Sequence, residues 1–397
     1  MIALYGQLMS TNVVPPNRPR RLLSIDGGGL CGIIPAQALI EIEKQLDALT
    51  GDPQPLCNRF DLIGGTSTGA ILAVGLALGF RAQQMRDFYL NFGPDIFTKV
   101  CLPERLWHKY PSAQIEEHLK NAFGATTTLG DPRLGTLVVI VTKNATRGND
   151  WFFTNNRNNP LSTRDKDIPL WHIVRASSAA PTYFPPHAFA VPDDTGTPQT
   201  YEFIDGGVSS YNNPSFQVFL EATAPEYGIN WPMGVNKLLL MSLGTGYSPV
   251  TIQEGEAKDY TVLNWAGYVL KELMNEANLE QNVLMSLIGE RPAQEPSASP
   301  DLAIPRAPSG TPSESALTHT SDGLQPNKLL TYQRITIELT RQRLDQLGIA
   351  TGIPLHHVDP LKVREMDAVD QIPNMQLVGE AVAKEQVHMD RLISFFK

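Results

Sequence analysis

The 397-residue sequence contains little cysteine, no excess of positive charge and no long apolar run. Its three cysteines lie without C-x-x-C or metal-ligand spacing, so neither a disulfide framework nor a zinc site is indicated. The net charge of −9 argues against DNA or RNA as a partner and against strong attraction to anionic lipid, so any membrane contact would depend on apolar groups. No stretch reaches the roughly 20 apolar residues of a membrane span, and the N-terminus lacks a secretory pattern. We therefore expect a cytoplasmic protein.

Composition divides the chain into four parts. Residues 1–19 are predicted to be a disordered leader, and residues 20–290 alternate strand and helix patterns as one α/β domain. Residues 291–327 are dense in Pro, Ser and Thr and predict a flexible excursion. Residues 328–397 carry a strand pattern over 329–339 and a helical pattern over 376–396, and we expect this C-terminal strand and its helices to pack on the core.

One stretch organises the rest of the sequence, a strand-like run that ends at two glycines before a helical pattern. Its centre, residues 65–69, reads G-x-S-x-G, with Gly65 and Gly69 on either side of Ser67. Such a turn tolerates no large side chain two residues from the serine, so the pattern predicts a nucleophile elbow. The same string also closes ordinary strand-to-helix loops, and the rest of the chain decides between the two.

A first glycine-rich corner precedes the elbow, between a strand pattern ending at Ile25 and a helix from Ile33. It comprises Asp26, Gly27, Gly28, Gly29 and Gly32. Consecutive glycines leave their backbone N–H groups exposed, and such groups can bind an anion next to a helix N-terminus. Gly27, Gly29 and Gly32 satisfy the dinucleotide fingerprint G-x-G-x-x-G, which favours an oxidoreductase. The second strand, however, ends in glycines and not in the acidic residue that fingerprint requires. The alternative is an oxyanion hole for acyl transfer.

A third corner, Asp205-Gly206-Gly207, follows the strand pattern that ends at Ile204. If its strand neighbours the other two in a parallel sheet, all three corners meet at one edge. Asp205 could then accept the proton of Ser67 directly, because partial burial raises the basicity of a carboxylate. A triad with His388 is the other option, although His388 lies in a helical pattern typical of a surface residue. Alone, Asp205 would be read as a turn residue.

The three motifs in this order resemble the patatin-like phospholipases. The likeness extends through Ala176-Ser177-Ser178-Ala179-Ala180-Pro181 and Leu243-Gly244-Thr245-Gly246, covering roughly residues 20 to 250. It implies a three-layer α/β/α fold with a mainly parallel sheet, with residues 20–290 as the catalytic domain. It also implies a Ser67/Asp205 dyad, an oxyanion hole from Gly27, Gly28 and Gly29, and hydrolysis of acyl esters of membrane phospholipids or other acyl lipids without a metal or cofactor.

The sequence departs from that family at Cys31, where an arginine or lysine usually precedes the last glycine of the first motif. A catalytically weak or inactive lipid- or nucleotide-binding protein on the same scaffold is therefore the alternative function. Members of the family also act in bacterial anti-phage defence, switched on by a cyclic nucleotide. The resemblance thus allows a cyclic-nucleotide activator, peripheral contact with the membrane and a homo-oligomer as further expectations.

Overall fold

The computed structural model describes residues 18–97, 108–160, 162–193, 195–248, 252, 255–292 and 328–397. Within these ranges, nine strands form one sheet in the order β5-β6-β3-β2-β1-β7-β9-β8, and β4 pairs with β3 outside that path. Five neighbouring pairs are parallel: β3–β2, β2–β1, β1–β7, β7–β9 and β9–β8. The strands are β1 (Arg20–Ile25), β2 (Leu62–Thr66), β3 (Leu137–Asn144), β4 (Asn149–Thr154), β5 (His187–Pro192), β6 (Pro198–Asp205), β7 (Leu238–Leu243), β8 (Gly289–Glu290) and β9 (Leu330–Ile335).

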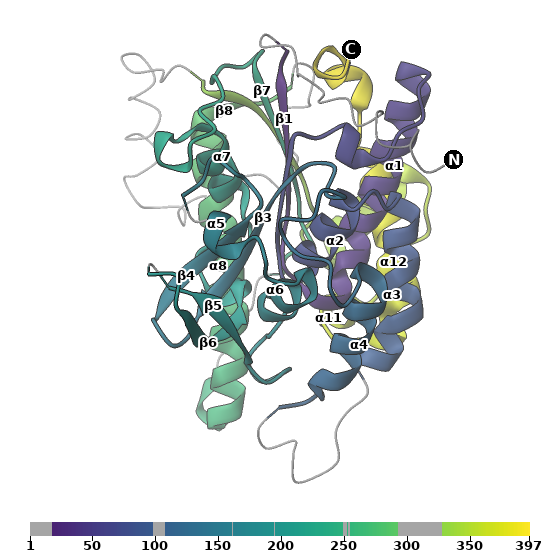
Figure 1. Ribbon diagram of the computed structural model, residues 1–397. Helices are drawn as coiled ribbons and strands as arrows, with labels where there is room; N and C mark the ends of the chain where they lie inside the picture. The colour runs from purple at the N-terminus through teal and green to yellow at the C-terminus, as the bar shows by residue number, and fades with distance from the viewer. Residues whose placement is uncertain are drawn as a thin grey trace, which may run out of the picture.

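Helices cover both faces of this sheet, which gives three layers (Figure 1). One face carries α1 (Ile33–Thr50), α2 (Thr68–Ala77), α3 (Ala82–Ile96), α4 (Ser112–Phe123), α6 (Leu170–Ser177) and α12 (Ile372–Gln386); the other carries α7 (Ser215–Thr223) and α8 (Val262–Ile288). The predicted α/β/α architecture with a mainly parallel sheet is thus confirmed.

Alternation along the central strands explains the two helical layers. Leu23 and Ile25 of β1 join the larger core beneath α1 and α2, whereas Leu22 joins the smaller core beneath α7. All three side chains are fully buried, as expected for a strand covered on both faces. No helix in the described part of the chain is long and apolar enough to cross a membrane.

The strand that delivers Asp205 differs from the expectation of three neighbouring parallel strands. β6 is antiparallel, and it pairs with β3 instead of β2. Thr66 pairs with Val141, and the next residue of β3, Thr142, pairs with Asp205. Since Ser67 follows Thr66, this register still brings Asp205 level with the end of β2. The last three residues of β6 pair with the last residues of β3, so β6 ends at the same edge of the sheet as β2. An antiparallel strand therefore also brings Asp205 close to Ser67.

The C-terminal part of the chain adds a strand to the sheet and several helices that cover α1. β9 pairs with β7 beside the sheet centre. The predicted single helix over 376–396 is wrong in extent: α12 begins at Ile372 and ends at Gln386, and a 3₁₀ segment, η10 (Met389–Phe395), follows. The short helices α10 (Arg341–Thr351) and α11 (Pro360–Val363) were not predicted. The leader as far as residue 17 and residues 293–327 of the excursion lie outside the described residues.

Candidate active site

Ser67 sits on a strained turn between β2 and α2. Its backbone angles are φ 54° and ψ −119°, a conformation that L-residues rarely adopt. The flanking glycines are needed for packing, because a Cβ at Gly65 would collide with the backbone of Gly69, and a Cβ at Gly69 would collide with the carbonyl of Ile25. The predicted G-x-S-x-G turn is therefore an elbow that presents the serine at a helix N-terminus.

The hydroxyl of Ser67 donates a hydrogen bond of 2.6 Å to Oδ2 of Asp205. The other carboxylate oxygen, Oδ1, accepts the N–H of Gly207 at 2.6 Å, which fixes the carboxylate plane. Burial raises the pKa of Asp205 to about 7, although both hydrogen bonds and the charge of Arg175 oppose the shift. A carboxylate with this pKa is a far better base than one in water.

Two residues that support this pair were not predicted as functional. Ser177 accepts the N–H of Ser67 at 2.8 Å and donates to the carbonyl of Val141 at 2.6 Å, so it ties the elbow to β3. Arg175 is fully buried; burial lowers its pKa to about 10, so it stays charged at neutral pH. Both lie on α6, next to the small-residue motif that carried part of the resemblance. The motif thus marked Ser177, but the sequence did not show that its side chain would connect the elbow to β3.

The first glycine corner lies against the elbow but corrects one expectation. The N–H of Gly27 donates to the carbonyl of Asn212 at 3.0 Å, so it is not free for an oxyanion. Within the described chain, the N–H groups of Gly28 and Gly29 have no hydrogen-bond acceptor. Gly29 has φ 58°, and a Cβ there would lie 2.5 Å from the carbonyl oxygen of Met366. Two amides therefore remain available where three were expected.

Residues from the C-terminal part hold the same corner in place. The carboxylate of Asp26 forms a buried ion pair with Arg334 of β9, whose Nη1 lies 2.8 Å from Oδ1. Burial alone would lower the pKa of Arg334, but the Asp26 carboxylate outweighs it and raises the pKa, so the guanidinium stays charged. The N–H of Leu30 donates to the carbonyl of Met366 at 2.9 Å. The corner is thus anchored by residues about 300 positions later in the chain.

Cys31, the residue that departs from the family pattern, is buried in this anchor. Its thiol lies 3.5 Å from the carbonyl of Val363, and burial raises its pKa to about 12. It is therefore a neutral packing group. The nearby glycines of the motifs are also closely packed: a Cβ at Gly32 would collide with Thr68, and one at Gly206 would lie 2.5 Å from the carbonyl oxygen of Val141.

A cavity opens directly over Ser67 and Asp205. Most of its wall is apolar and comes from α2, α3, α8 and the loop after α6; the lining includes Ile71, Phe92, Ile96, Phe184, Leu270 and Met274. An apolar pocket with a few convergent polar groups at one end suits a ligand with a long hydrocarbon part and one reactive polar group.

The histidine alternative finds no support in the described residues. The Nε2 of His388 donates a hydrogen bond of 2.9 Å to the carbonyl oxygen of Glu385, and no described histidine has a hydrogen bond with Ser67 or Asp205. No group of three or more His, Cys, Asp or Glu side chains in the described ranges is placed to hold a metal ion.

These features define a three-layer α/β protein with a serine–aspartate pair at a strand-to-helix elbow. Residues 23–218 match the family model of the patatin-like phospholipases. The chain is 34% identical to Patatin-like protein 2 of Arabidopsis thaliana and 31% identical to Patatin-17 of Solanum cardiophyllum, in each case over 62% of this chain. It belongs to the patatin-like phospholipase family.

The chain spans just under two thirds of these relatives, 64% of the first and 66% of the second. Among solved structures, the crystal structure of VipD from Legionella pneumophila aligns with 90% of this chain and 67% of that chain, at 12% identity and a TM-score of 0.34. At that level of similarity it adds nothing to the assignment.

Proposed function

We propose that this protein is a lipid acyl hydrolase of the phospholipase A or lysophospholipase type, and that Ser67 and Asp205 are its catalytic residues. The observation that carries the proposal is the 2.6 Å hydrogen bond from Ser67 to a buried carboxylate at the polar end of an apolar cavity. Nucleophile and base are within direct reach, and the cavity accepts a hydrocarbon chain. The family match supports the same class of reaction.

The geometry supports a two-step reaction. Ser67 Oγ attacks the ester carbonyl carbon while its proton passes to Asp205, and the N–H groups of Gly28 and Gly29 stabilise the oxyanion. Collapse breaks the bond to the alcohol oxygen, which takes the proton from Asp205, and leaves an acyl group on Ser67. Water then attacks the acyl-enzyme, with Asp205 again accepting and returning a proton, and the fatty acid is released.

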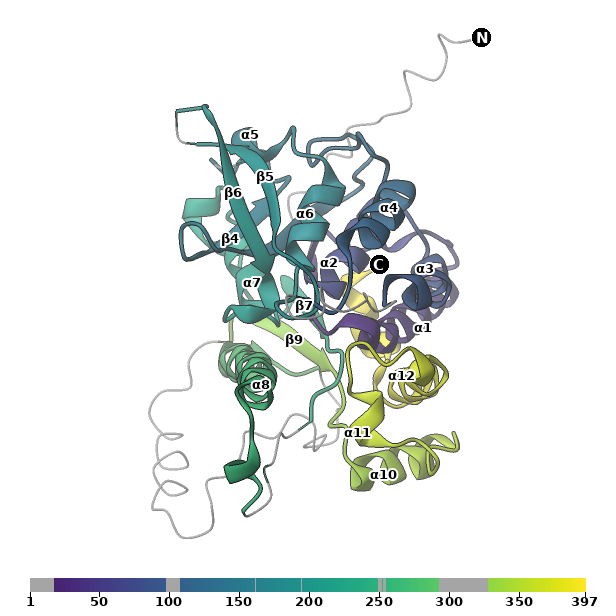
Figure 2. The ribbon, with the colours of Figure 1, turned by 90° about the horizontal axis from the view of Figure 1, so that it is seen from below.

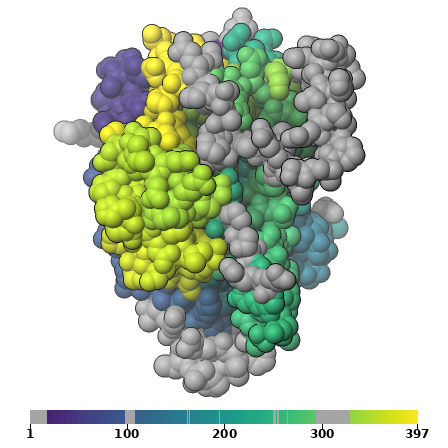
Figure 3. Space-filling model, turned by 180° about the vertical axis from the view of Figure 1, so that it is seen from behind, coloured from purple at the N-terminus to yellow at the C-terminus, as the bar shows by residue number. Residues whose placement is uncertain are grey.

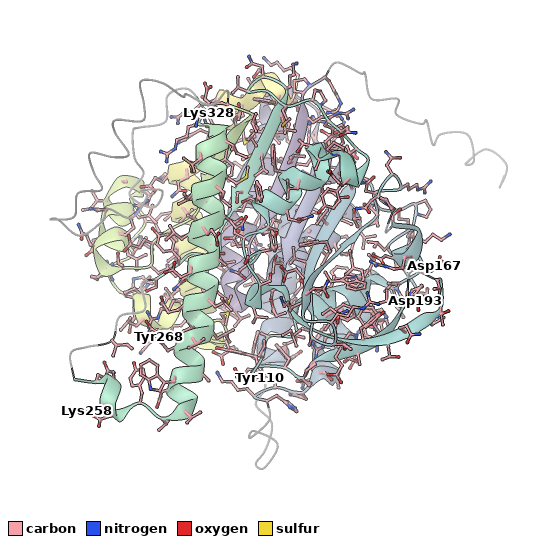
Figure 4. The ribbon with its side chains drawn as sticks, turned by 90° about the vertical axis from the view of Figure 1, so that its left-hand side faces the viewer. Tyr110, Asp167, Asp193, Lys258, Tyr268 and Lys328 are labelled. Atoms are coloured by element: carbon pink, nitrogen blue, oxygen red, sulfur yellow. The ribbon has the colours of Figure 1, made fainter. Side chains whose placement is uncertain are left out.

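The first half of α8 supports contact with a lipid surface. Val262, Trp265, Val269 and Leu273 recur at helical spacing and are 85%, 40%, 59% and 43% exposed. Leu270, on the same half of the helix, lines the apolar cavity. Figure 4 shows this end of α8, near Tyr268, projecting beyond the sheet. An apolar helix face joined to the cavity wall would place the cavity at the membrane surface, with little help from charge.

Three further expectations stay predictions. A cyclic nucleotide that activates the protein in anti-phage defence, and a homo-oligomer, come from the resemblance alone. The binding-protein alternative rested on Cys31, which in the structure is a buried packing residue. Turnover of short-chain esters separates a hydrolase from a binding protein.

The test is fatty-acid release from phospholipid vesicles by the wild type and by Ser67→Ala, with and without a panel of cyclic nucleotides. Release by the wild type alone supports the proposal, and release that requires a nucleotide adds the switch. No release in any condition, together with no hydrolysis of p-nitrophenyl butyrate, would refute it.

A further inference from the structure

A second cavity lies against the glycine corner, where Gly27 and Gly28 form part of its wall. It shares Met274 and Met366 with the apolar cavity, so the two adjoin at the corner. Its remaining wall comes mainly from α8 and from the loop after β7, residues 245–248, and Arg364 and Met366 just after α11 complete it. Figure 2 shows α8 and α11 on either side of this end of the molecule. Figure 3 shows the C-terminal part and α8 neighbouring each other on the back surface.

The charge of this cavity is positive. Arg364 and Lys271 line it, and none of the lining residues in the described part of the chain is acidic. Glu365 lies beside them, with Oε1 2.8 Å from the Lys271 amine and 3.7 Å from Arg364 Nε. Two cations and one carboxylate leave a net charge of about +1. Arg364 donates to Ser248 Oγ at 3.1 Å, while its buried Nε has no hydrogen bond in the described chain.

A buried amide next to Ser67 also lacks a partner. Asn212 is 1% exposed, and its Nδ2 donates to Asn278 Oδ1 at 2.9 Å. Its Oδ1 is buried and has no hydrogen bond with any described residue. This oxygen lies 2.3 Å from the position that a Cβ on Gly27 would take and 2.7 Å from that of a Cβ on Gly207; Gly27 lines the polar cavity and Gly207 the apolar one. A buried acceptor without a donor is costly, which indicates that a ligand hydroxyl or water satisfies it.

We propose that this cavity binds the phosphodiester head group of the lipid substrate, with Arg364 as the residue that selects it. The inference rests on the proposed hydrolase function and adds a second subsite to it. The acyl chain would occupy the apolar cavity, the ester would lie at Gly28 and Gly29, and the head group would extend toward Arg364. A phosphodiester carries one negative charge and matches the net charge of the cavity, whereas a neutral sugar or glycerol would leave that net positive charge unbalanced.

Arg364, Lys271 and Met366 all lie outside residues 23–218, the part that matches the family. The charged residues of the proposed head-group subsite therefore come from the later part of the chain, while Gly27, Gly28 and Asn212 come from the matched region.

The test compares two soluble substrates that differ only in the head group: monomeric dihexanoylphosphatidylglycerol and dihexanoylglycerol. Arg364→Gln should lower kcat/KM for the phospholipid about 10- to 100-fold, the range for one lost charged hydrogen bond, and change the value for dihexanoylglycerol less than about threefold. Arg364→Lys should retain part of the preference. Arg86→Gln is the matched control, since Arg86 and Arg364 are 23% and 24% exposed and Arg86 lines neither cavity. Equal losses on both substrates, or no loss, would overturn the subsite.

Direct binding separates failure of the subsite from failure of the hydrolase. Calorimetric titration of Ser67→Ala with glycerophosphoglycerol should show binding that Arg364→Gln removes and that glycerol does not reproduce. Such binding without turnover of any ester would refute the hydrolase and support the phosphodiester site. Ester hydrolysis that does not depend on Arg364 would support the hydrolase and refute the phosphodiester site. Glycerophosphoglycerol should inhibit the wild type competitively; activation instead would assign the cavity to an effector and overturn its role as a substrate subsite.

Discussion

Replacing Asp205 by Asn is the most informative perturbation of the site, because it removes the base while keeping the shape. An asparagine can still accept the N–H of Gly207 and face Ser67, so the elbow should remain in place. Loss of general-base catalysis typically costs about 10²- to 10⁴-fold in rate, or about 3–5 kcal/mol of barrier. We expect kcat to fall within that range while the fold persists.

The pH profile of the wild type follows from the same carboxylate. Asp205 accepts a proton only when ionised, and burial raises its pKa to about 7. Below that pH the ionised fraction falls about tenfold per unit, so activity at pH 5 should be about 1% of the alkaline plateau. The residual activity of Asp205→Asn should not show this fall at acidic pH.

Stability should move in the opposite direction from activity. The pKa of Asp205 is 3.8 ordinarily and about 7 in the folded protein, so the folded state binds the extra proton between these values. The free energy of unfolding therefore falls as the pH rises through this window, by up to about 4 kcal/mol. Asp205→Asn removes that dependence and should be more stable than the wild type at pH 8.

The assays are hydrolysis of p-nitrophenyl butyrate from pH 5 to 9 and urea unfolding of both proteins at pH 5 and pH 8. Ser67→Ala, which keeps the carboxylate, is the control for the pH dependence of unfolding. More than about a tenth of wild-type activity in Asp205→Asn would refute the dyad. A wild-type profile that stays flat between pH 5 and 8 would contradict the raised pKa.

Three other changes test separate parts of the structure. Ser67→Gly should be more stable than Ser67→Ala by about 1 kcal/mol in urea unfolding, because only glycine adopts φ 54° without strain; equal stabilities would contradict a strained elbow. Arg334→Met should destabilise the protein by about 3–5 kcal/mol, since it leaves the buried Asp26 carboxylate without its partner, and the double change with Asp26→Asn should recover part of the loss. Replacing Trp265 and Val269 by Ser should weaken sedimentation with phosphatidylcholine vesicles about tenfold or more while leaving p-nitrophenyl butyrate hydrolysis unchanged; a loss of both would place these side chains in the fold instead of at a lipid surface.

Much of the architecture could be predicted because its signals are local. The elbow at Ser67 and the glycine corner at residues 26–32 are short patterns whose glycines have no room for a Cβ. The structure also places Asp205 beside Ser67, as the three glycine-bearing corners suggested.

The parts that could not be predicted depend on pairings between distant residues. The residue pattern of a strand does not reveal whether the strand runs parallel or antiparallel to its neighbours. We expected β6 to be parallel, but it pairs with β3 in the antiparallel sense. The acceptor of the Gly27 N–H is a loop carbonyl of Asn212, which no local motif marks. Arg334 lies within an ordinary strand pattern, and only the sheet order places it beside Asp26. Helix α10 was missed because its apolar face is weak and its packing comes from α12.

The ion pair between Asp26 and Arg334 joins residues 308 positions apart, and Met366 completes the same corner. A chain that is synthesised from its N-terminus therefore has Ser67 and Asp205 long before the partner of Asp26 exists. Ser67 and Asp205 are therefore synthesised before the residues that support the amides of Gly28 and Gly29. A chain cut after residue 292 would keep Ser67 and Asp205 but lack this support, so the site is assembled only after Met366 has been synthesised.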